Sequence, residues 1–313
     1  MQIHYDLDNF KALNPVVTIG TFDGVHLGHR EVISELKQLS VLSGGESVVF
    51  TFEPHPRIVI SPQEDTLRLL STKEEKIKLM EKIGVDHLVI YPFTKEFSKL
   101  TYDEFVTKIL VGKMNILSLV VGYDHRFGQG RQGDFHSLER LSGSLNFKVE
   151  QLSQLIVDNK VVSSTKIRQA LEDGNIIKAN HFLGYQYALT GKVVEGKRLG
   201  RTIGFPTANI DTCDRHKLVP GDGVYAVLIE LNGKSFQGML NIGIRPTVNS
   251  NADHKTIEVN IFNFDEDIYN SSITTLFIEK IRDEQKFDRL ELLQTQLAKD
   301  KIHALSIFSK YKL

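Results

Sequence analysis

The sequence predicts two domains of different class, an α/β domain with a parallel sheet followed by an antiparallel β domain. The chain has 313 residues, which exceeds the size of a typical single core. In its first half, short β-rich runs alternate with helical patterns, whereas from about residue 187 strand patterns follow one another without helices between them. Because this rhythm changes after about residue 184, we expect one domain over residues 1–184 and a second over residues 185–313.

The expected elements of the first domain alternate between strand and helix. The strands are the apolar runs 15–19, 47–52, 87–91, 117–121 and 147–152, and the helices are the patterns 30–42, 72–83, 102–110 and 137–141. Strands separated by helices of this length need crossover connections, which build a parallel sheet covered on both faces. A last helix begins at the hydroxyl side chains of residues 163–165 and ends at Gly174.

The expected elements of the second domain are mainly strands. They are the runs 187–194, 223–231, 235–242, 256–262 and 273–280. Turn sequences such as Asn232-Gly233 separate them, and an amphipathic helix covers residues 287–311. This pattern predicts an antiparallel sandwich or barrel closed by a C-terminal helix.

The composition is that of an ordinary globular protein, with 41% hydrophobic and 25% charged residues. The formal net charge is −1, so we expect no nonspecific binding to nucleic acid or to a membrane surface. The single cysteine, Cys213, excludes an internal disulfide framework and fits a reducing compartment. The sequence shows no signal-peptide pattern and no apolar run of spanning length, which predicts a cytoplasmic protein.

Residues 20–30 read Gly-Thr-Phe-Asp-Gly-Val-His-Leu-Gly-His-Arg and follow the first expected strand, at the edge where open parallel sheets bind ligands. His26 and His29 would share one face of the first helical turn, whose free N–H groups and dipole favour an anion. Gly28 would leave room for a phosphate or a base. An isolated His-x-x-His can equally be two surface histidines or a chance pair at metal spacing, but its place after a strand and a glycine-bounded turn favours a phosphate site.

A second helix start carries groups suited to the same chemistry. Residues 163–168 read Ser-Ser-Thr-Lys-Ile-Arg, which places Thr165 and Arg168 on one helix face. The hydroxyl and the guanidinium can together bind phosphate oxygens. Considered alone, the segment is explained by a helix N-cap followed by a solvent-exposed arginine. Together the two segments suggest nucleotidyl transfer, in which positioned cations and Mg²⁺ stabilise the charge that gathers when a phosphate attacks the α-phosphorus of ATP.

Residues 20–30 resemble the His-x-Gly-His signature of nucleotidyltransferases, in the form found in the FMN adenylyltransferase half of bacterial bifunctional riboflavin kinase/FAD synthetases. Residues 51–56, 122–128 and 163–168 are similar to the same half, although His125 stands where an aromatic residue is expected. The resemblance implies a Rossmann-like nucleotidyltransferase domain in which His26, His29 and Arg168 are catalytic. The nucleotide-binding residues that it implies are Gly20, Phe22, Asp23, Gly28, Asp124, Ser164 and Thr165.

Residues 191–210 form a glycine-rich segment with basic residues, including Lys197, Arg198 and Arg201. Such a segment can wrap backbone amides around a polyphosphate. In the Pro-Thr-Ala-Asn near its end, Thr207 and Asn209 offer two neutral oxygen ligands on one strand face, which suit Mg²⁺. Glycine turns in a β domain would explain the glycines but not the basic cluster or the Pro-Thr-Ala-Asn.

This segment resembles the riboflavin kinase module, in which the Thr and Asn of Pro-Thr-Ala-Asn bind the metal carried by ATP. The resemblance implies a six-stranded barrel with a terminal helix, and Thr207 and Asn209 as the Mg²⁺ ligands. The nucleotide-binding residues that it implies are Gly191, Gly196, Lys197, Gly204, Thr207 and Asn209.

A kinase step benefits from a base, because the 5′-hydroxyl of riboflavin loses its proton as it attacks the γ-phosphorus. Glu258 is our candidate because it matches the glutamate regarded as catalytic in the family; without that match, a solvent-facing strand glutamate is the better interpretation. The resemblance also implies that Arg282 and Glu284 flank the flavin. Asn260 and Asn270 depart from the histidine and glycine that relatives often carry there.

Two other phosphate-binding patterns are rejected. Residues 191–198 nearly spell a P-loop, but Arg198 replaces the final Ser or Thr and no helix is expected after it. Residues 128–133 match Gly-x-Gly-x-x-Gly by letter, yet they follow the fourth strand across a polar loop, which argues against a nicotinamide oxidoreductase.

We therefore expect a bifunctional enzyme with Mg²⁺ at each site. The second domain would convert riboflavin and ATP to FMN and ADP, and the first would convert FMN and ATP to FAD and pyrophosphate. A weak homo-oligomer is compatible with this expectation. Two alternatives stay open, a flavin- or nucleotide-binding regulator that has lost the chemistry and an enzyme with only one active half.

Overall fold

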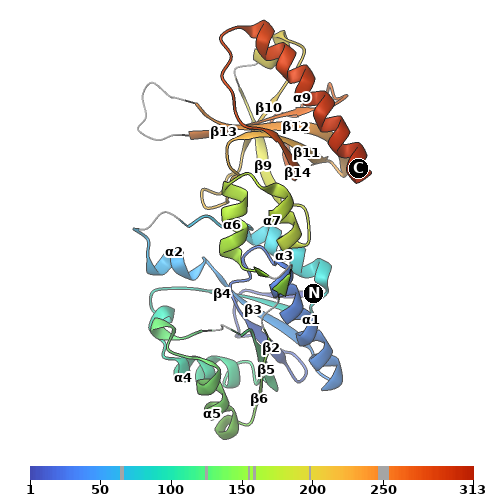
Figure 1. Ribbon diagram of the computed structural model, residues 1–313. Coiled ribbons are helices and arrows are strands. Elements are labelled where there is room, and N and C mark those ends of the chain that lie inside the picture. The colour runs from blue at the N-terminus through green and yellow to red at the C-terminus, as the bar shows by residue number, and fades with distance from the viewer. Residues whose placement is uncertain (64–66, 124–125, 154–155, 158–159, 197–198, 246–253) are drawn as a thin grey trace. The chain divides into compact units, whose positions relative to one another are not determined.

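The computed structural model describes residues 1–63, 67–123, 126–153, 156–157, 160–196, 199–245 and 254–313. Its internal contacts divide the chain into two compact units, Met1–Ser164 and Thr165–Leu313 (Figure 1). Helix α6 (Ser164–Glu172) therefore begins at the division, and α7 (Ile176–Leu183) belongs to the second unit. The change in the sequence pattern from alternating strands and helices to strands alone places the domain boundary later, at residue 184. That boundary between the two predicted catalytic domains stays a prediction.

The first unit is built on a parallel sheet, as expected. Among its described residues the sheet has six strands in the order β1-β4-β3-β2-β5-β6, and every strand pair is parallel. The strands are β1 (Gln2–His4), β2 (Val16–Ile19), β3 (Ser47–Glu53), β4 (His87–Pro92), β5 (Ser118–Val121) and β6 (Lys148–Gln151). All five predicted strands are confirmed, whereas β1 was missed because its three residues are partly exposed and carry no apolar run.

Helices cover both faces of this sheet. On one face α1 (Leu27–Leu42) and α3 (Lys73–Ile83) pack Ile33 and Met80 against the strands. On the other face lie α4 (Tyr102–Glu104), the π-helix η2 (Phe105–Val111) and α5 (Phe135–Leu145) (Figure 1). The apolar side chains of both layers are buried, which gives the unit a core on each side of the sheet.

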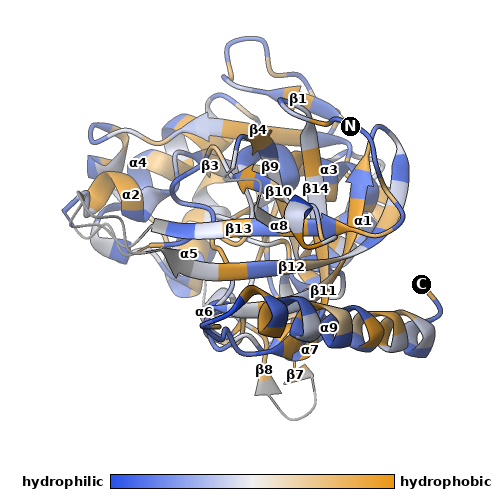
Figure 2. Cartoon of the chain, turned by 90° about the horizontal axis from the view of Figure 1, so that it is seen from above, coloured by the Kyte–Doolittle hydropathy of each residue, from blue (hydrophilic) through white to orange (hydrophobic). Residues whose placement is uncertain are grey.

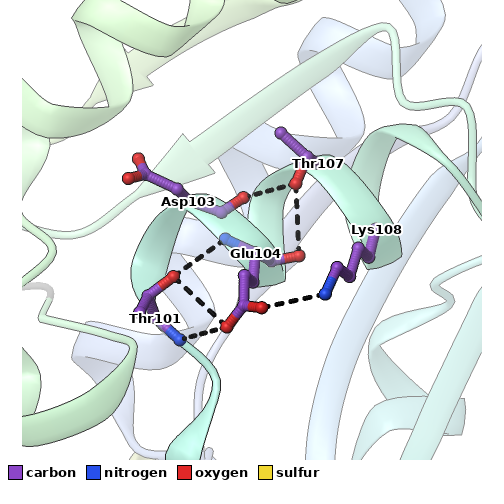
Figure 3. Close-up of polar contacts among 5 residues, drawn as sticks. All are labelled: Thr101, Asp103, Glu104, Thr107 and Lys108. Carbon is purple, nitrogen blue, oxygen red and sulfur yellow. Dashed lines mark hydrogen bonds and ion pairs between the residues drawn. The ribbon is translucent and has the colours of Figure 1, made fainter.

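The predicted helix 102–110 begins as an α-helix and widens into a π-helix. Thr101 caps it, because its hydroxyl accepts from the backbone of Glu104 at 3.2 Å while the Glu104 carboxylate accepts from the backbone of Thr101 at 3.2 Å (Figure 3). Lys108 pairs with Glu104 at 2.8 Å, and the Thr107 hydroxyl donates to the Asp103 carbonyl at 2.7 Å. These local contacts start the helix that covers this face of the sheet.

The second unit contains a closed antiparallel barrel. Its described strands are arranged in the order β10-β13-β12-β11-β14-β9, and β9 pairs with β10 to close the ring. The strands are β9 (Ala188–Val194), β10 (Ala208–Asp211), β11 (Gly223–Leu231), β12 (Lys234–Arg245), β13 (His254–Ile261) and β14 (Ser272–Arg282). The six-stranded barrel implied by the resemblance is confirmed.

Helix α9 (Leu290–Tyr311) packs on the outside of the barrel, as the C-terminal pattern predicts. Ala304, Ile307 and Phe308 are buried with side chains of the strands, among them Val224 and Met239. Hydrophobic and hydrophilic segments alternate along α9 in Figure 2, which is typical of a helix with one buried face. Among the described residues no helix is both long and apolar enough to cross a bilayer.

Helix α7 is fastened to the same barrel through one amide side chain. Asn180 Nδ2 donates to the Phe277 carbonyl of β14 at 2.8 Å, and Asn180 Oδ1 accepts from the Tyr187 backbone at 2.7 Å. These bonds explain why α7 belongs with the second unit. The remaining elements are α2 (Pro56–Ile60), α8 (Leu199–Thr202), the 3₁₀ helices η1 (Phe97–Lys99) and η3 (Gln129–Arg131), and the hairpin β7 (Ile156–Val157) and β8 (Lys160–Val161).

Candidate active sites

The first candidate site lies where the chain order of the parallel sheet changes direction. Strand β2 lies between β3 and β5, so the connections after β2 and after β5 leave on different sides of the sheet. Open parallel sheets bind ligands at the carboxyl ends of such strands. Residues 20–29 follow β2 at this edge, as the sequence predicts.

The turn after β2 has an unusual backbone. Phe22, Gly24 and Val25 have φ values of 47°, 79° and 38°, a left-handed region that is unfavourable for phenylalanine and especially for valine. A Cβ on Gly20 would lie 3.1 Å from the Phe22 ring, so the ring would have to shift slightly to make room for it. Such strained backbone persists where the surrounding structure holds it and is often found at ligand sites.

Asp23 holds this turn in place. Its side chain is 2% exposed, and Oδ1 accepts from the backbone N–H of Leu70 at 2.9 Å and of Ser71 at 3.2 Å. The Ser71 hydroxyl accepts from the Gly24 backbone at 3.0 Å, and the Ser164 hydroxyl donates to the Asp23 carbonyl at 3.1 Å. Asp23 and Ser164, both predicted to bind nucleotide, thus order the turn within the protein.

His26 and His29 form a stacked pair at the start of α1. Their ring centroids are 3.7 Å apart at an interplanar angle of 14°. His26 is the N-cap, and its Nδ1 accepts from the His29 backbone at 3.4 Å, so a neutral His26 carries its proton on Nε2. Gly28 lies against this pair, and a Cβ there would make a tight contact of 3.3 Å with the His26 ring.

His29 is the polar group in this site that still needs a partner. Its Nδ1 is buried and has no hydrogen-bond partner in the part of the chain that the structure describes. Burial lowers the pKa of His29 well below its ordinary value, and the nearby His26 and Lys76 lower it further. A neutral imidazole at the N-terminus of a helix is suited to a phosphate oxygen that arrives with the ligand.

The other residues predicted for this site are described less completely. Thr165 and Arg168 lie on α6 in the second unit, Thr165 exposed and Arg168 half-buried. Their approach to the histidines stays a prediction. Asp124 and His125 lie outside the described residues.

The second candidate site lies on β10 and β13 of the barrel. Asn209 is directly opposite Glu258 in the register of the two strands, so both side chains are on one face. Glu258 lies between the buried Ile257 and Val259, which places it on the face of β13 turned away from the barrel core. The Thr207 hydroxyl donates to Glu258 Oε2 at 3.3 Å. The predicted base and the two predicted metal ligands are therefore neighbours.

The glycines beside this cluster allow close packing. A Cβ on Gly196 would lie 2.0 Å from Asn209 Nδ2, one on Gly191 would lie 2.4 Å from the Asp211 carbonyl, and one on Gly200 would lie 2.2 Å from the Phe205 carbonyl. Gly204 instead has φ 79°, which favours glycine. Lys197 and Arg198, predicted to bind polyphosphate, lie outside the described residues.

Family models match the two halves of the chain separately. A model described as FAD synthetase matches residues 10–166, and one described as riboflavin kinase matches residues 183–308. The bifunctional riboflavin kinase/FMN adenylyltransferase of Buchnera aphidicola is 36% identical and is covered over 99% of both chains. The chain belongs to this family. The enzyme of the same name from Escherichia coli is 37% identical, with 95% of this chain and 94% of its own covered.

A solved structure is similar over the same length. It is described as a macrolide-efflux protein from Streptococcus pneumoniae, is 31% identical to this chain, covers 96% of each chain, and has a TM-score of 0.86. The membership in the bifunctional family confirms the resemblance found in residues 20–30 and 191–210.

The structure gives Asn260, one of the two departures from the family pattern, a structural role. Its side chain is buried, and Nδ2 donates to the Pro206 carbonyl at 2.6 Å, directly before Thr207. Asn260 therefore fixes the segment that carries the predicted metal ligands. Asn270, the other departure, has φ 64°, a conformation that asparagine tolerates almost as well as glycine does. Both substitutions thus suit the backbone of the family fold.

Arg282, predicted to flank the flavin, has an ion-pair partner within the protein, and Glu284, predicted for the same role, lies against Gly243 of β12. Arg282 binds both carboxylate oxygens of Asp300 on α9, with three N···O distances of 2.9–3.0 Å. Asp300 is 2% exposed, so this fork fastens α9 to the end of β14. The Glu284 carboxylate lies against Gly243, where a Cβ would be 1.9 Å from Oε1. Their contact with flavin stays a prediction.

Sequence reasoning missed Lys76 and Asp300 as contributors to these sites, and it noted Asn260 only as a departure from the family pattern. Lys76 lies four residues before the buried Met80 on α3, so the signal was a lysine on the apolar face of a predicted helix. Asp300 is likewise a carboxylate on the buried face of the C-terminal helix, four residues before Ala304. The partners of these side chains lie far away in the sequence and could not be predicted from local patterns.

Gly196→Ala is expected to slow FMN formation by about 100-fold, because the added methyl would displace Asn209 by an ångström or more. FAD formation from supplied FMN should keep the wild-type rate. Both rates are measured by chromatography of the flavins. Gly143→Ala is the matched control, since a Cβ on Gly143 meets nothing within 4 Å. An unchanged kinase rate in Gly196→Ala would show that Asn209 is not a ligand in this reaction.

Proposed function

We propose that the barrel phosphorylates riboflavin and that the parallel-sheet unit adenylylates the FMN produced. The observation that carries this assignment is that each unit holds its own cluster of suitable groups. Thr207, Asn209 and Glu258 lie together on the barrel, and His26 and His29 lie at the start of α1. The separate matches of the two family models to residues 10–166 and 183–308 support the same division.

In the kinase step, Glu258 accepts the proton of the riboflavin 5′-hydroxyl. That oxygen forms a bond to the γ-phosphorus of ATP while the bond from the γ-phosphorus to the β,γ-bridging oxygen breaks, and ADP leaves. Thr207 and Asn209 fit Mg²⁺, because uncharged oxygens suit a hard ion that keeps phosphate oxygens and waters as its other ligands. Bound there, Mg²⁺ would offset the charge of the transferred phosphoryl group.

In the adenylyl-transfer step, a phosphate oxygen of FMN forms a bond to the α-phosphorus of ATP. The bond to the α,β-bridging oxygen breaks and pyrophosphate leaves, so no covalent enzyme intermediate is needed. His26, His29 and the N–H groups at the start of α1 stabilise the charge on the α-phosphate. The family resemblance predicts that Thr165 and Arg168 bind nucleotide phosphates through a hydroxyl and a guanidinium.

The two rival assignments make different predictions for turnover. A binding protein that regulates flavin use would hold ATP and flavin without forming product, and an enzyme with one active half would form either FMN or FAD only. The presence of both clusters in one chain favours two activities. We assign both reactions to the cytoplasm, where ATP is available, and leave self-association as a weak homo-oligomer as a prediction.

Removal of divalent metal tests the Mg²⁺ assignment. Protein treated with EDTA is expected to form neither FMN from riboflavin nor FAD from supplied FMN, and added Mg²⁺ should restore both rates. Asn209→Leu should raise the Mg²⁺ concentration needed for half-maximal kinase rate and leave that of adenylyl transfer unchanged. Either reaction running at full rate in EDTA would refute a metal requirement for that step.

A further inference from the structure

Lys76 is a buried lysine next to the turn that precedes the two histidines. It lies on α3 and is 7% exposed, although lysine is rarely buried unless it is paired. Its Nζ donates to the Thr21 carbonyl at 2.9 Å and lies 3.5 Å from Thr51 Oγ1. The Thr51 hydroxyl donates to the same carbonyl at 3.2 Å. Two donors from α3 and β3 therefore converge on one backbone oxygen.

The Thr21 carbonyl lies where the unusual backbone of this turn begins. It directly precedes Phe22, the first of the residues with positive φ, and follows Gly20. Backbone in this region needs neighbours that hold it. Asp23 supplies one anchor through the backbone of Leu70 and Ser71, just before α3. Lys76 supplies the other from α3 itself, so the helix and the segment just before it hold the turn at two places.

The ammonium of Lys76 also contributes to the electrostatics of the histidine site. Burial lowers the pKa of Lys76 below its ordinary value, and the carboxylates of Asp23 and Glu53 oppose this effect by favouring the protonated form. The groups that act on His29 are His26 in the same helical turn and Lys76 from α3. A fixed positive charge behind a phosphate site stabilises anionic ligands and transition states.

We propose that Lys76 is a positioning residue for adenylyl transfer, which fixes the turn after β2 through the Thr21 carbonyl and acts electrostatically on His29. This inference rests on the proposed assignment of adenylyl transfer to the histidine site. Lys76 touches the protein backbone and not the reacting phosphates, so it acts through the turn and through His29. It has no role in the kinase step.

Lys76→Met tests the proposal, because methionine keeps the length of the apolar stem and removes the ammonium. FAD formation from supplied FMN is expected to fall by about 100-fold, as for a small misplacement of catalytic groups. FMN formation by the barrel should be unchanged and reports that the chain is folded. Lys78→Met is the matched control, an exposed lysine on the same helix, and should behave as wild type.

Lys76→Arg tests whether FAD formation depends on the positive charge of the side chain or only on its volume. Arginine keeps the positive charge and a donor for the Thr21 carbonyl, so FAD formation should exceed that of Lys76→Met by about tenfold or more. A melting curve of each variant accompanies the rates. Equal losses in the arginine and methionine variants would overturn the proposal, and so would an unchanged rate in Lys76→Met.

The pH profile provides a readout that a merely structural lysine would not move. The profile of kcat/KM for FAD formation reports groups that ionise in the free enzyme. Removal of the Lys76 charge lets His29 bind a proton more readily, so the acidic transition should move to higher pH in Lys76→Met. A transition that stays at the wild-type pH would contradict the electrostatic part of the inference.

His29→Ala distinguishes failure of this inference from failure of the assignment on which it rests. If His29→Ala keeps full FAD formation, the histidine site is not the adenylyl-transfer site and the proposed function of the first unit is wrong. If His29→Ala loses FAD formation while Lys76→Met keeps it, the site is correct and Lys76 has no positioning role. Loss in both variants, with recovery in Lys76→Arg, is the expected result.

Discussion

Glu258→Gln is expected to slow FMN formation by about 10²- to 10⁴-fold, the usual contribution of a positioned general base. Glutamine keeps the size of the side chain and an oxygen that accepts from the Thr207 hydroxyl, now 3.3 Å from Glu258 Oε2. It cannot take the proton of the riboflavin hydroxyl. FAD formation from supplied FMN should be unchanged because the histidine pair is untouched. The two rates are measured separately by chromatography of riboflavin, FMN and FAD.

Glu230→Gln is the matched control for this variant. Glu230 is an exposed glutamate on β11 of the same barrel, and it is not part of the cluster around Thr207. Its substitution should leave both rates unchanged. If Glu258→Gln slowed both reactions equally, the division of labour between the two units would be wrong; if it slowed neither, Glu258 would be the solvent-facing strand glutamate of the alternative interpretation.

His29→Ala is expected to reduce FAD formation by about 10²- to 10³-fold, the effect of removing one preorganised donor to a developing charge. The imidazole has a buried Nδ1 with no partner among the described residues, so its loss leaves no structural hydrogen bond broken at that atom. Stability should therefore fall less than activity does. FMN formation should continue at the wild-type rate.

His136→Ala is the control for this histidine. His136 lies on α5 of the same unit, with 85% of its side chain exposed. Both reactions should be unaffected in this variant. A His29→Ala protein that melts far below the wild type, with its FAD formation lost in proportion, would indicate that His29 serves folding and not adenylyl transfer.

Local sequence signals were sufficient for most of the fold. The apolar runs gave the five predicted strands of the sheet, because fully buried parallel strands carry little besides apolar residues. The start of α1 was expected near His26, which is its N-cap. The glycine-bounded turn after β2 indicated where the ligand binds, because open parallel sheets bind ligands at the carboxyl ends of their strands.

Long-range contacts could not be predicted in the same way. Lys76 bonds to Thr21, 55 residues earlier, and Asn260 bonds to Pro206, 54 residues earlier. Arg282 was predicted to flank the flavin, and its ion pair with Asp300 of α9 was not foreseen. These partners depend on how helices and strands pack across the fold, which periodicity within one element does not report.

Several glycines illustrate the same limit on a smaller scale. Gly28 was expected to leave room for a ligand and Gly196 to help wrap backbone amides around a polyphosphate, and in the structure they lie against the side chains of His26 and Asn209. The sequence identified positions where an added Cβ would crowd a neighbouring side chain. It did not identify which neighbour excludes the Cβ, because that neighbour lies on another turn or strand. The functional consequence is the same, since each glycine places a predicted site residue.

The most direct test of two coupled activities is a timed incubation of the purified protein with riboflavin, ATP and Mg²⁺, with the three flavins separated by chromatography. The account predicts that FMN appears first and that FAD follows as FMN is consumed. Accumulation of FMN without FAD would contradict the assignment of adenylyl transfer to the histidine site. Absence of any turnover would contradict both assignments and favour a flavin- or nucleotide-binding protein.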